Sequence, residues 1–244
     1  MKHWIVSIVF GLSALPGLAQ AAGGGAPMKS MEVDLSQEAL RDGAETFVDN
    51  CLGCHSAKYF RYKNLQTDLG MSRSFVEDEL MYGMVNVNDK MRSAMEAEAG
   101  GDWLGAEPPD LSLTARVRGT DWIYSYLLSF YQDDTHTGWN NEVFPQASMP
   151  NVLVHMTDGA HEYYTEDVAK AHAHAHSEEG GHFEFPEAPE ELDKKVQNLV
   201  SFMSYMADPS VLKRQSMGPW VLLFIVVLGI VTFLVKKEYW RDIH

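Results

Sequence analysis

Two amphipathic helices lie far apart along the chain. Ser36 can cap the first, Glu38 complements its dipole, and apolar residues then recur at helical spacing on one face: Leu40, Ala44, Phe47, Val48 and Cys51. The second covers about 190–206, ends at Asp208-Pro209, and has its apolar stripe at Leu192, Val196, Leu199, Val200, Met203 and Met206. Because such stripes pack against a core, we expect both helices to be core elements.

Shorter patterns between these helices predict further helices and few strands. Thr120 can cap a third helix that continues to about Gln132, with its inward face at Ile123, Leu127, Phe130 and Tyr131. Ser74 and Glu77 form a capping box before a short helix that ends at about Met84. Met91 and Met95 are expected to pack from one face of another helix. Strand signals are weak, so the pattern predicts a mainly α domain with long loops.

The N-terminal segment has the layout of a secretory signal peptide. Lys2 gives a positive start, a mostly apolar stretch follows from Trp4 to Leu18, and Ala19-Gln20-Ala21 is a small-x-small cleavage site. We therefore expect residues 1–21 to be removed and the exported chain to begin at Ala22. A short uncleaved anchor is the alternative interpretation.

A long apolar segment near the C-terminus predicts a membrane anchor. Residues 217–235 carry no charged side chain, and as a helix they would extend about 29 Å, enough to cross a hydrocarbon core. Aromatic residues flank the segment, as is typical of membrane interfaces: Trp220, Tyr239 and Trp240. Basic residues lie on both sides, so their bias does not orient the helix. The signal peptide does, and it predicts an exported domain at 22–210 and a cytoplasmic tail at 236–244.

Composition and net charge argue against some classes of protein. The chain has 244 residues, 45% of them hydrophobic, and a formal net charge of −15 from 19 Lys+Arg and 34 Asp+Glu. The apolar fraction excludes wholesale disorder, and the acidic balance argues against a nucleic-acid partner. An acidic domain suits a basic soluble partner instead.

Both cysteines fall in one motif, Cys51-Leu52-Gly53-Cys54-His55, which has the C-x-x-C-H spacing of c-type haem attachment. Two thiols at this spacing can add to the two vinyl groups of one porphyrin, and the adjacent His can ligate the iron. A redox dithiol would need a βαβ context, and a Cys₄ zinc site would need a second cysteine pair. The motif and the two long helices together predict a class I cytochrome c-like domain in which these helices cross beside the haem.

A sixth iron ligand is also needed, and Met149 is the best local candidate. It lies in the loop Phe144-Pro-Gln-Ala-Ser-Met149-Pro150, where the proline stiffens the chain directly after the methionine. A thioether ligand raises the reduction potential and suits electron transfer. Local sequence leaves several rivals open: Met84, Met91, Met95 and Met156.

Four segments resemble the cytochrome c1 family, the haem subunits of ubiquinol–cytochrome c reductase (cytochrome bc1) complexes. They are GAETFVDNCLGCHS, EPPDLSLTARVRGTDWIYSYLLSFY, FPQASMPNVL and VSFMSYMADP…KKEYWRDIH, which follow the family's order between positions 43 and 244. The resemblance implies one covalent haem c on Cys51 and Cys54, with His55 and Met149 as axial ligands. It further implies a propionate partner at Arg118, less so at Arg116, and a backbone carbonyl of the Pro108-Pro109 segment on the His55 imidazole.

The resemblance also implies the function. A family member takes one electron from a Rieske iron–sulfur protein, passes it to a soluble basic cytochrome c, and works beside a cytochrome b subunit. It is not an enzyme by itself. The short loops and the sequence of the Met149 segment resemble those of bacterial members of the family. A bacterial member would have its haem domain in the periplasm and its anchor in the cytoplasmic membrane.

Other interpretations remain open. A c-type subunit of a terminal oxidase would share the anchor and the haem motif. A haem enzyme such as a peroxidase would need an open iron position or a second haem motif. A metal-binding protein without a redox role would depend on the histidine run alone. The histidine run lies inside the segment 160–189 and consists of His172, His174, His176 and His182. We expect it to be a solvated loop, and binding of Zn or Cu is the alternative. The acidic segment 91–104 is a candidate docking surface.

Overall fold

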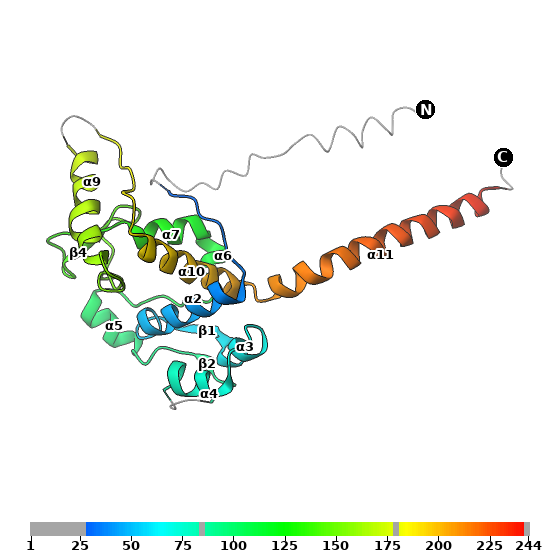
Figure 1. Cartoon of the computed structure of the whole chain (residues 1–244), viewed down its shortest axis with the longest axis horizontal. Helices are drawn as coiled ribbons and strands as arrows, with labels where there is room; N and C mark the ends of the chain where they lie inside the picture. The colour runs from blue at the N-terminus through cyan, green and yellow to red at the C-terminus, as the bar shows by residue number, and fades with distance from the viewer. Residues whose placement is uncertain (1–27, 83–85, 178–180, 242–244) are drawn as a thin grey trace.

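The computed structural model describes residues 28–82, 86–177 and 181–241. The signal peptide expected at 1–21 and the end of the short helix expected at Met84 lie outside the described residues. Within the described residues the domain is mainly α-helical, as predicted, with long irregular loops and two small sheets. One long helix, α11, runs away from the other elements (Figure 1).

The helices alternate with short strands along the chain. The helices of the first half are α2 (Gln37–Asn50), α3 (Tyr62–Thr67), α4 (Arg73–Phe75), the π-helical turn η2 (Val76–Leu80), α5 (Ala97–Leu104), α6 (Thr114–Arg118) and α7 (Thr120–Leu128). Those of the second half are α8 (Ala160–Glu162), the π-helical turn η3 (Tyr163–Asp167), α9 (Val168–Ala175), α10 (Glu190–Ala207) and α11 (Ser210–Tyr239). The strands form two antiparallel pairs, β1 (Ala57–Arg61) with β2 (Lys90–Met91) and β3 (Phe130–Gln132) with β4 (Trp139–Asn141).

The two long helices predicted from the apolar stripes are confirmed as the centre of the core. Ser36 caps α2 by accepting a hydrogen bond from the Ala39 backbone N–H. Every stripe residue of α2 and α10 is buried. The two helices pack against each other more extensively than any other pair of elements, so they form the frame of the domain (Figure 1).

A glycine lets α2 and α10 approach closely. A Cβ built on Gly43 would lie 2.1 Å from the Asn198 carbonyl oxygen of α10, far inside van der Waals contact. The neighbouring Asp42 carboxylate accepts hydrogen bonds from the Asn198 amide, at 2.7 Å, and from the Lys195 ammonium. One turn further on, the rings of Phe47 and Phe202 meet with centroids 5.7 Å apart. Polar and apolar contacts therefore fix the same crossing.

The other predicted elements needed correction. The third helix, expected from Thr120 to Gln132, ends at Leu128, because Ser129 leaves helical geometry and Phe130 and Tyr131 join β3 instead. The short helix begins after Ser72, whose hydroxyl accepts from the Phe75 N–H, so the capping box predicted at Ser74 and Glu77 was wrong.

The helix predicted around Met91 and Met95 was also wrong. Met91 lies in β2 and is fully buried, and Met95 precedes α5. The histidine-rich segment is not a loop throughout, since α8, η3 and α9 fold its first half. Tyr163 and Tyr164 in η3 are buried, and their hydroxyls donate to the carbonyls of Leu128 and Leu127 at 3.1 and 2.9 Å.

Helix α11 contains the apolar segment expected to cross a membrane. The part from Ser216 to Tyr239 is long and apolar enough to span a bilayer, and its apolar window is not buried against the other residues that the structure describes. Only Asp208 and Pro209 separate α11 from α10. The Asp208 carboxylate accepts from the Ser210 hydroxyl at 2.5 Å and from Arg214 at 2.9 Å, and these contacts hold its pKa below the usual value. The junction is therefore only two residues long, and its Asp208 carboxylate is hydrogen-bonded to the beginning of α11.

We predict that Gly43→Ala destabilises the domain by about 1–3 kcal/mol, because the added methyl group must push α2 and α10 apart. Thermal unfolding of the full chain followed by circular dichroism measures the change. Gly101→Ala is the matched control, since a Cβ at Gly101 in α5 meets nothing within 4 Å. The control should leave stability unchanged or raise it by about 0.5–1 kcal/mol. Equal melting temperatures for the two variants would contradict the proposed close packing.

Candidate functional site

The Cys51–His55 motif forms the turn that ends α2. The Cys51 N–H donates to the Phe47 carbonyl at 2.9 Å, and the His55 N–H donates to the Cys51 carbonyl at 2.8 Å. The apolar face of α2 therefore buries Cys51, which is 8% exposed, while Cys54 remains partly exposed. Burial raises the pKa of the Cys51 thiol to about 12. Such a pKa is unlike that of the low-pKa thiolate in a redox dithiol, which argues against a thiol–disulfide function.

The His55 imidazole is oriented by the Pro109 backbone. Its Nδ1 lies 2.8 Å from the Pro109 carbonyl oxygen, which can only accept, so Nδ1 carries the proton. The Nε2 lone pair is then the one available to bind a metal. Burial also lowers the pKa of His55, which favours the neutral ring that a metal requires. The predicted carbonyl contact of the Pro108-Pro109 segment is present.

Side chains hold the Pro109 segment beside the motif. The Asp110 carboxylate accepts from the Lys58 backbone N–H at 2.9 Å, and the Ser112 hydroxyl accepts from the Tyr59 N–H at 3.1 Å. The Leu111 N–H donates to the Ser56 carbonyl at 2.8 Å. The strand that follows His55 is thereby bonded to the segment that carries Pro109.

A cavity of about 370 Å³ opens beside the motif and receives side chains from several elements. It is lined mainly by apolar groups, and the predicted site residues among them are Cys51, Cys54, His55, Pro109, Arg118 and Met149. Its volume and apolar lining are typical of a cofactor pocket. Arg116 is not brought to it. That guanidinium points elsewhere and lies 3.9 Å from the Asp208 carboxylate.

Arg118 brings positive charge to the cavity wall. Its guanidinium carbon lies 4.9 Å from the centroid of the Trp122 ring, which in turn stacks on Tyr126 with centroids 5.1 Å apart. Among the lining residues that the structure describes, Arg118 is the permanent cation. A guanidinium that lies over an indole in this way is suited to pair with a carboxylate group of a bound cofactor.

Met149 reaches the same cavity from the loop after β4. The Tyr126 hydroxyl lies 3.5 Å from its sulfur and can donate to it. Of the rival methionines, Met91, Met95 and Met156 do not line the cavity, and Met84 lies outside the described residues. Met203 of α10, which the stripe analysis assigned to the core, lines the cavity as a second thioether.

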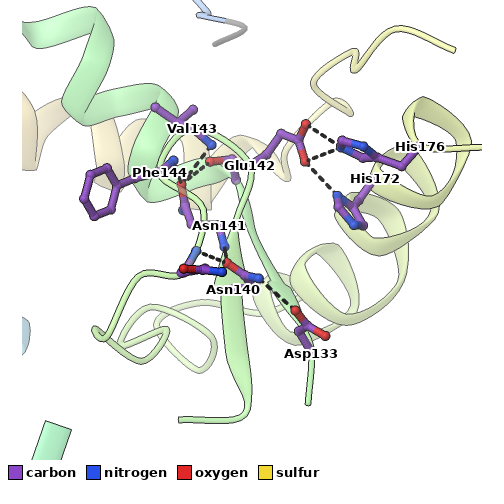
Figure 2. Close-up of polar contacts among 10 residues, drawn as sticks. Asp133, Asn140, Asn141, Glu142, Val143, Phe144, His172 and His176 are labelled. Carbon is purple, nitrogen blue, oxygen red and sulfur yellow. Dashed lines mark hydrogen bonds and ion pairs between the residues drawn. The ribbon is translucent and has the colours of Figure 1, made fainter. Parts of the chain in front are cut away.

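Two asparagines that sequence reasoning missed shape the Met149 loop (Figure 2). The Asn141 side-chain Oδ1 accepts from the Val143 and Phe144 N–H groups at 3.0 and 2.9 Å, and its Nδ2 donates to the Tyr126 backbone carbonyl at 2.7 Å. The Asn140 side chain accepts from the Gln146 N–H at 2.7 Å, where the backbone has a positive φ of 62°. An Asn-Asn pair directly before a turn sequence was the available signal.

Comparison with known proteins identifies the chain. A family model described as "Cytochrome C1 family" matches residues 27–243. The chain belongs to the cytochrome c1 family. Membership implies a c-type haem and the role of a redox electron-transfer subunit of a respiratory complex III.

Individual relatives agree over nearly the full length. The cytochrome c1 of Allochromatium vinosum is 38% identical over 94% of this chain and 95% of its own, and that of Rhodospirillum rubrum is 27% identical over 94% and 93%. A Nitrosomonas europaea protein named "Ammonia monooxygenase gamma subunit" is 37% identical over 94% of both chains. A chain of a solved structure titled "Hyperthermophilic respiratory Complex III" matches over the whole of both chains at 18% identity with a TM-score of 0.46.

The residues of the cavity fit the haem that cytochrome c1 membership implies. The lining combines an apolar wall, two free thiols, a neutral imidazole with Nε2 available, a thioether and a guanidinium. Each of these groups has a chemical counterpart on a haem: the ring, the two vinyl groups, the iron and the propionates.

We predict that Asn141→Ala lowers the stability of the domain by several kcal/mol. The fully buried side chain serves four polar groups, and each buried group left unpaired costs about 1–3 kcal/mol. Chemical unfolding of the full chain measures the loss. Asn88→Ala, at an exposed turn, is the control and should change stability by less than about 0.5 kcal/mol. Similar unfolding midpoints for the two variants would refute the role of Asn141.

Proposed function

We propose that this chain carries one covalent haem c and passes single electrons from a Rieske iron–sulfur protein to a soluble cytochrome c within a cytochrome bc1-type complex. The observation that carries the proposal is the cavity, where the C-x-x-C-H turn, Met149 and Arg118 meet. When bound, the haem supplies a one-electron iron couple. The protein's contribution is ligation, burial and placement.

Each residue has a defined part in this proposal. Cys51 and Cys54 form thioether bonds, each S–H adding across one vinyl C=C bond of the porphyrin. The His55 Nε2 and the Met149 sulfur would be the two protein ligands of the iron, a pair that suits electron transfer. The Pro109 carbonyl keeps the proton on His55 Nδ1, and the Tyr126 hydroxyl orients the thioether. Arg118 pairs with the propionates, and Arg116 is a weaker candidate for the same role because it faces Asp208.

The placement of the chain follows from both ends. In this proposal residues 1–21 direct export, residues 22–210 form the periplasmic haem domain, residues 217–235 cross the cytoplasmic membrane, and residues 236–244 remain in the cytoplasm. The apolar surface of α11, which none of the other described residues covers, supports anchoring. Cytochrome b and the Rieske protein are the expected partners in the membrane. The match over residues 27–243 favours this role over a c-type subunit of a terminal oxidase.

An acidic surface near the cavity supports a basic electron acceptor. Glu98 and Asp102 lie on α5, and the cavity wall includes Leu104 at the end of that helix and Glu107 beyond it. The acidic segment 91–104 therefore ends at the wall of the cavity. Attraction of this kind speeds encounter without building a tight complex, which suits a carrier that must leave after each electron.

We predict that Met149→Leu converts a low-spin, high-potential haem into a high-spin or low-potential one, because the thioether ligand is lost. Absorption spectroscopy and a redox titration of the purified protein measure the change. Met203→Leu is the matched control, since Met203 lines the same cavity and the substitution nearly conserves volume. If Met203→Leu changes the spectrum and Met149→Leu does not, the axial assignment is wrong.

The partner assignment has its own test. Purification of the full chain from its native membrane in mild detergent should yield a complex with a cytochrome b and a Rieske protein. Isolation with the subunits of a terminal oxidase would instead support the alternative role.

We predict that electron transfer to a basic cytochrome c slows as ionic strength rises from low salt, because screening removes an attraction that can raise encounter rates about 10- to 1000-fold. Stopped-flow kinetics measure the rate. Glu98→Gln with Asp102→Asn should reduce the low-salt rate, whereas Glu238→Gln, at the far end of α11, should not. A rate that rises with salt would exclude the acidic docking surface.

A further inference from the structure

A carboxylate and two imidazoles meet on the side of the domain formed by β4 and α9 (Figure 2). Glu142 follows β4 directly, and His172 and His176 come from α9 and its C-terminal end. The His172 Nδ1 lies 2.7 Å from one Glu142 oxygen, and the His176 Nε2 lies 3.1 Å from the other. One ligand atom from each residue lies within 4.8 Å of the others.

The placement of the histidines follows from helical spacing. Residues at positions i and i+4 lie on the same face of a helix, so His172 and His176 point to one side together. His174, between them, is on a different face. A pair of histidines at this spacing with one carboxylate from another element is a donor set that zinc accepts with a water as its fourth ligand.

Burial and charge at the cluster also suit a cation. The Glu142 side chain is 10% exposed, His172 is 28% exposed and His176 is 59% exposed, so the carboxylate is nearly buried while one side remains open to solvent. The Tyr131 ring stacks on His172 with centroids 3.8 Å apart and fixes its orientation. Asp133 is close enough for its charge to interact with His172, which adds negative potential.

The spacing needs little adjustment for a metal. In a tetrahedral site with metal–ligand distances of about 2.0 Å, neighbouring ligand atoms lie roughly 3.3 Å apart. The nitrogen–oxygen separations of 2.7 and 3.1 Å are shorter than this by about 0.6 and 0.2 Å, and all three ligand atoms lie within 4.8 Å of one another. The ion would take the place of the proton that each imidazole directs at the carboxylate, and in each ring that proton would move to the other nitrogen.

We propose that Glu142, His172 and His176 bind one divalent transition-metal ion, with Zn²⁺ or Cu²⁺ as the class that imidazole and carboxylate ligands select. None of the three residues lines the haem cavity, so the site is separate from the proposed electron-transfer centre. The bound ion would join α9 to the residue directly after Asn141. It would thus hold the histidine-rich segment against the base of the Met149 loop.

Equilibrium dialysis against ZnCl₂ tests the proposal. The haem-loaded full chain, purified in detergent without a polyhistidine tag and stripped with a chelator, should bind one Zn²⁺ as measured by elemental analysis. Loss of even an outer partner of a metal ligand costs about 10- to 100-fold in affinity. His172→Ala, His176→Ala and Glu142→Gln should therefore each weaken binding at least about tenfold.

Two controls separate this site from general binding by histidines. His174→Ala removes a histidine of the same run from the other helix face, and His161→Ala breaks a stacked pair with His155, whose ring centroid is 5.7 Å away. Both controls should keep full affinity. A loss in His174→Ala equal to that in His172→Ala would mean diffuse binding along the run, and a loss in His161→Ala would move the site elsewhere. Either result overturns the proposal.

A spectroscopic measurement on the unaltered chain tests the same site without depending on the folding of a variant. Cu²⁺ added to one equivalent should give an electron paramagnetic resonance spectrum with coupling to two imidazole nitrogens. A spectrum without nitrogen coupling would overturn the proposal. An unchanged haem absorption spectrum in each variant shows that a loss of metal is local, which also distinguishes failure of this site from failure of the proposed haem function.

Discussion

The close approach of α2 and α10 is the constraint on which the rest of the domain depends. Gly43 permits it, and Asp42 fixes it through Asn198 and Lys195. Because α2 ends at Cys51, the crossing determines where the C-x-x-C-H turn lies. Because α10 contributes Leu199 and Met203 to the cavity wall, the same crossing also shapes the wall of the cavity. A shift at one glycine would therefore move both the attachment point and its surroundings.

Around this frame, short polar contacts replace regular secondary structure. The segments that carry Pro109 and Met149 are loops, and their backbone N–H and C=O groups lack the regular hydrogen bonds of a helix or sheet. Asp110 and Ser112 serve the first loop, and Asn140 and Asn141 serve the second. Each is a side chain that accepts from a backbone N–H, so loop shape is specified by particular residues and not by repetition.

The features that could be predicted from the sequence are those that depend on residues close together along the chain. The stripes of α2 and α10 and the C-x-x-C-H motif are local signals. The stripes predicted both helices, and the motif predicted a candidate site whose Cys51, Cys54 and His55 line the cavity. The end of α7 was missed because Phe130 pairs with Asn141, a contact between distant positions that periodicity does not reveal. Met149 could not be separated from Met91 by local sequence, since only the fold buries one in β2 and turns the other to the cavity. Glu142 drew no attention, because its partners lie far along the chain.

The junction at Asp208 and Pro209 has a mechanical consequence. The cavity is lined in part by α10, and α10 passes to α11 through these two residues alone, with Asp208 bonded to Ser210 and Arg214. So short a link allows few changes of backbone conformation between the domain and α11. The orientation of the cavity relative to α11 is therefore set by the backbone of these two residues, and every group that α10 contributes to the cavity is held in a fixed relation to the start of α11.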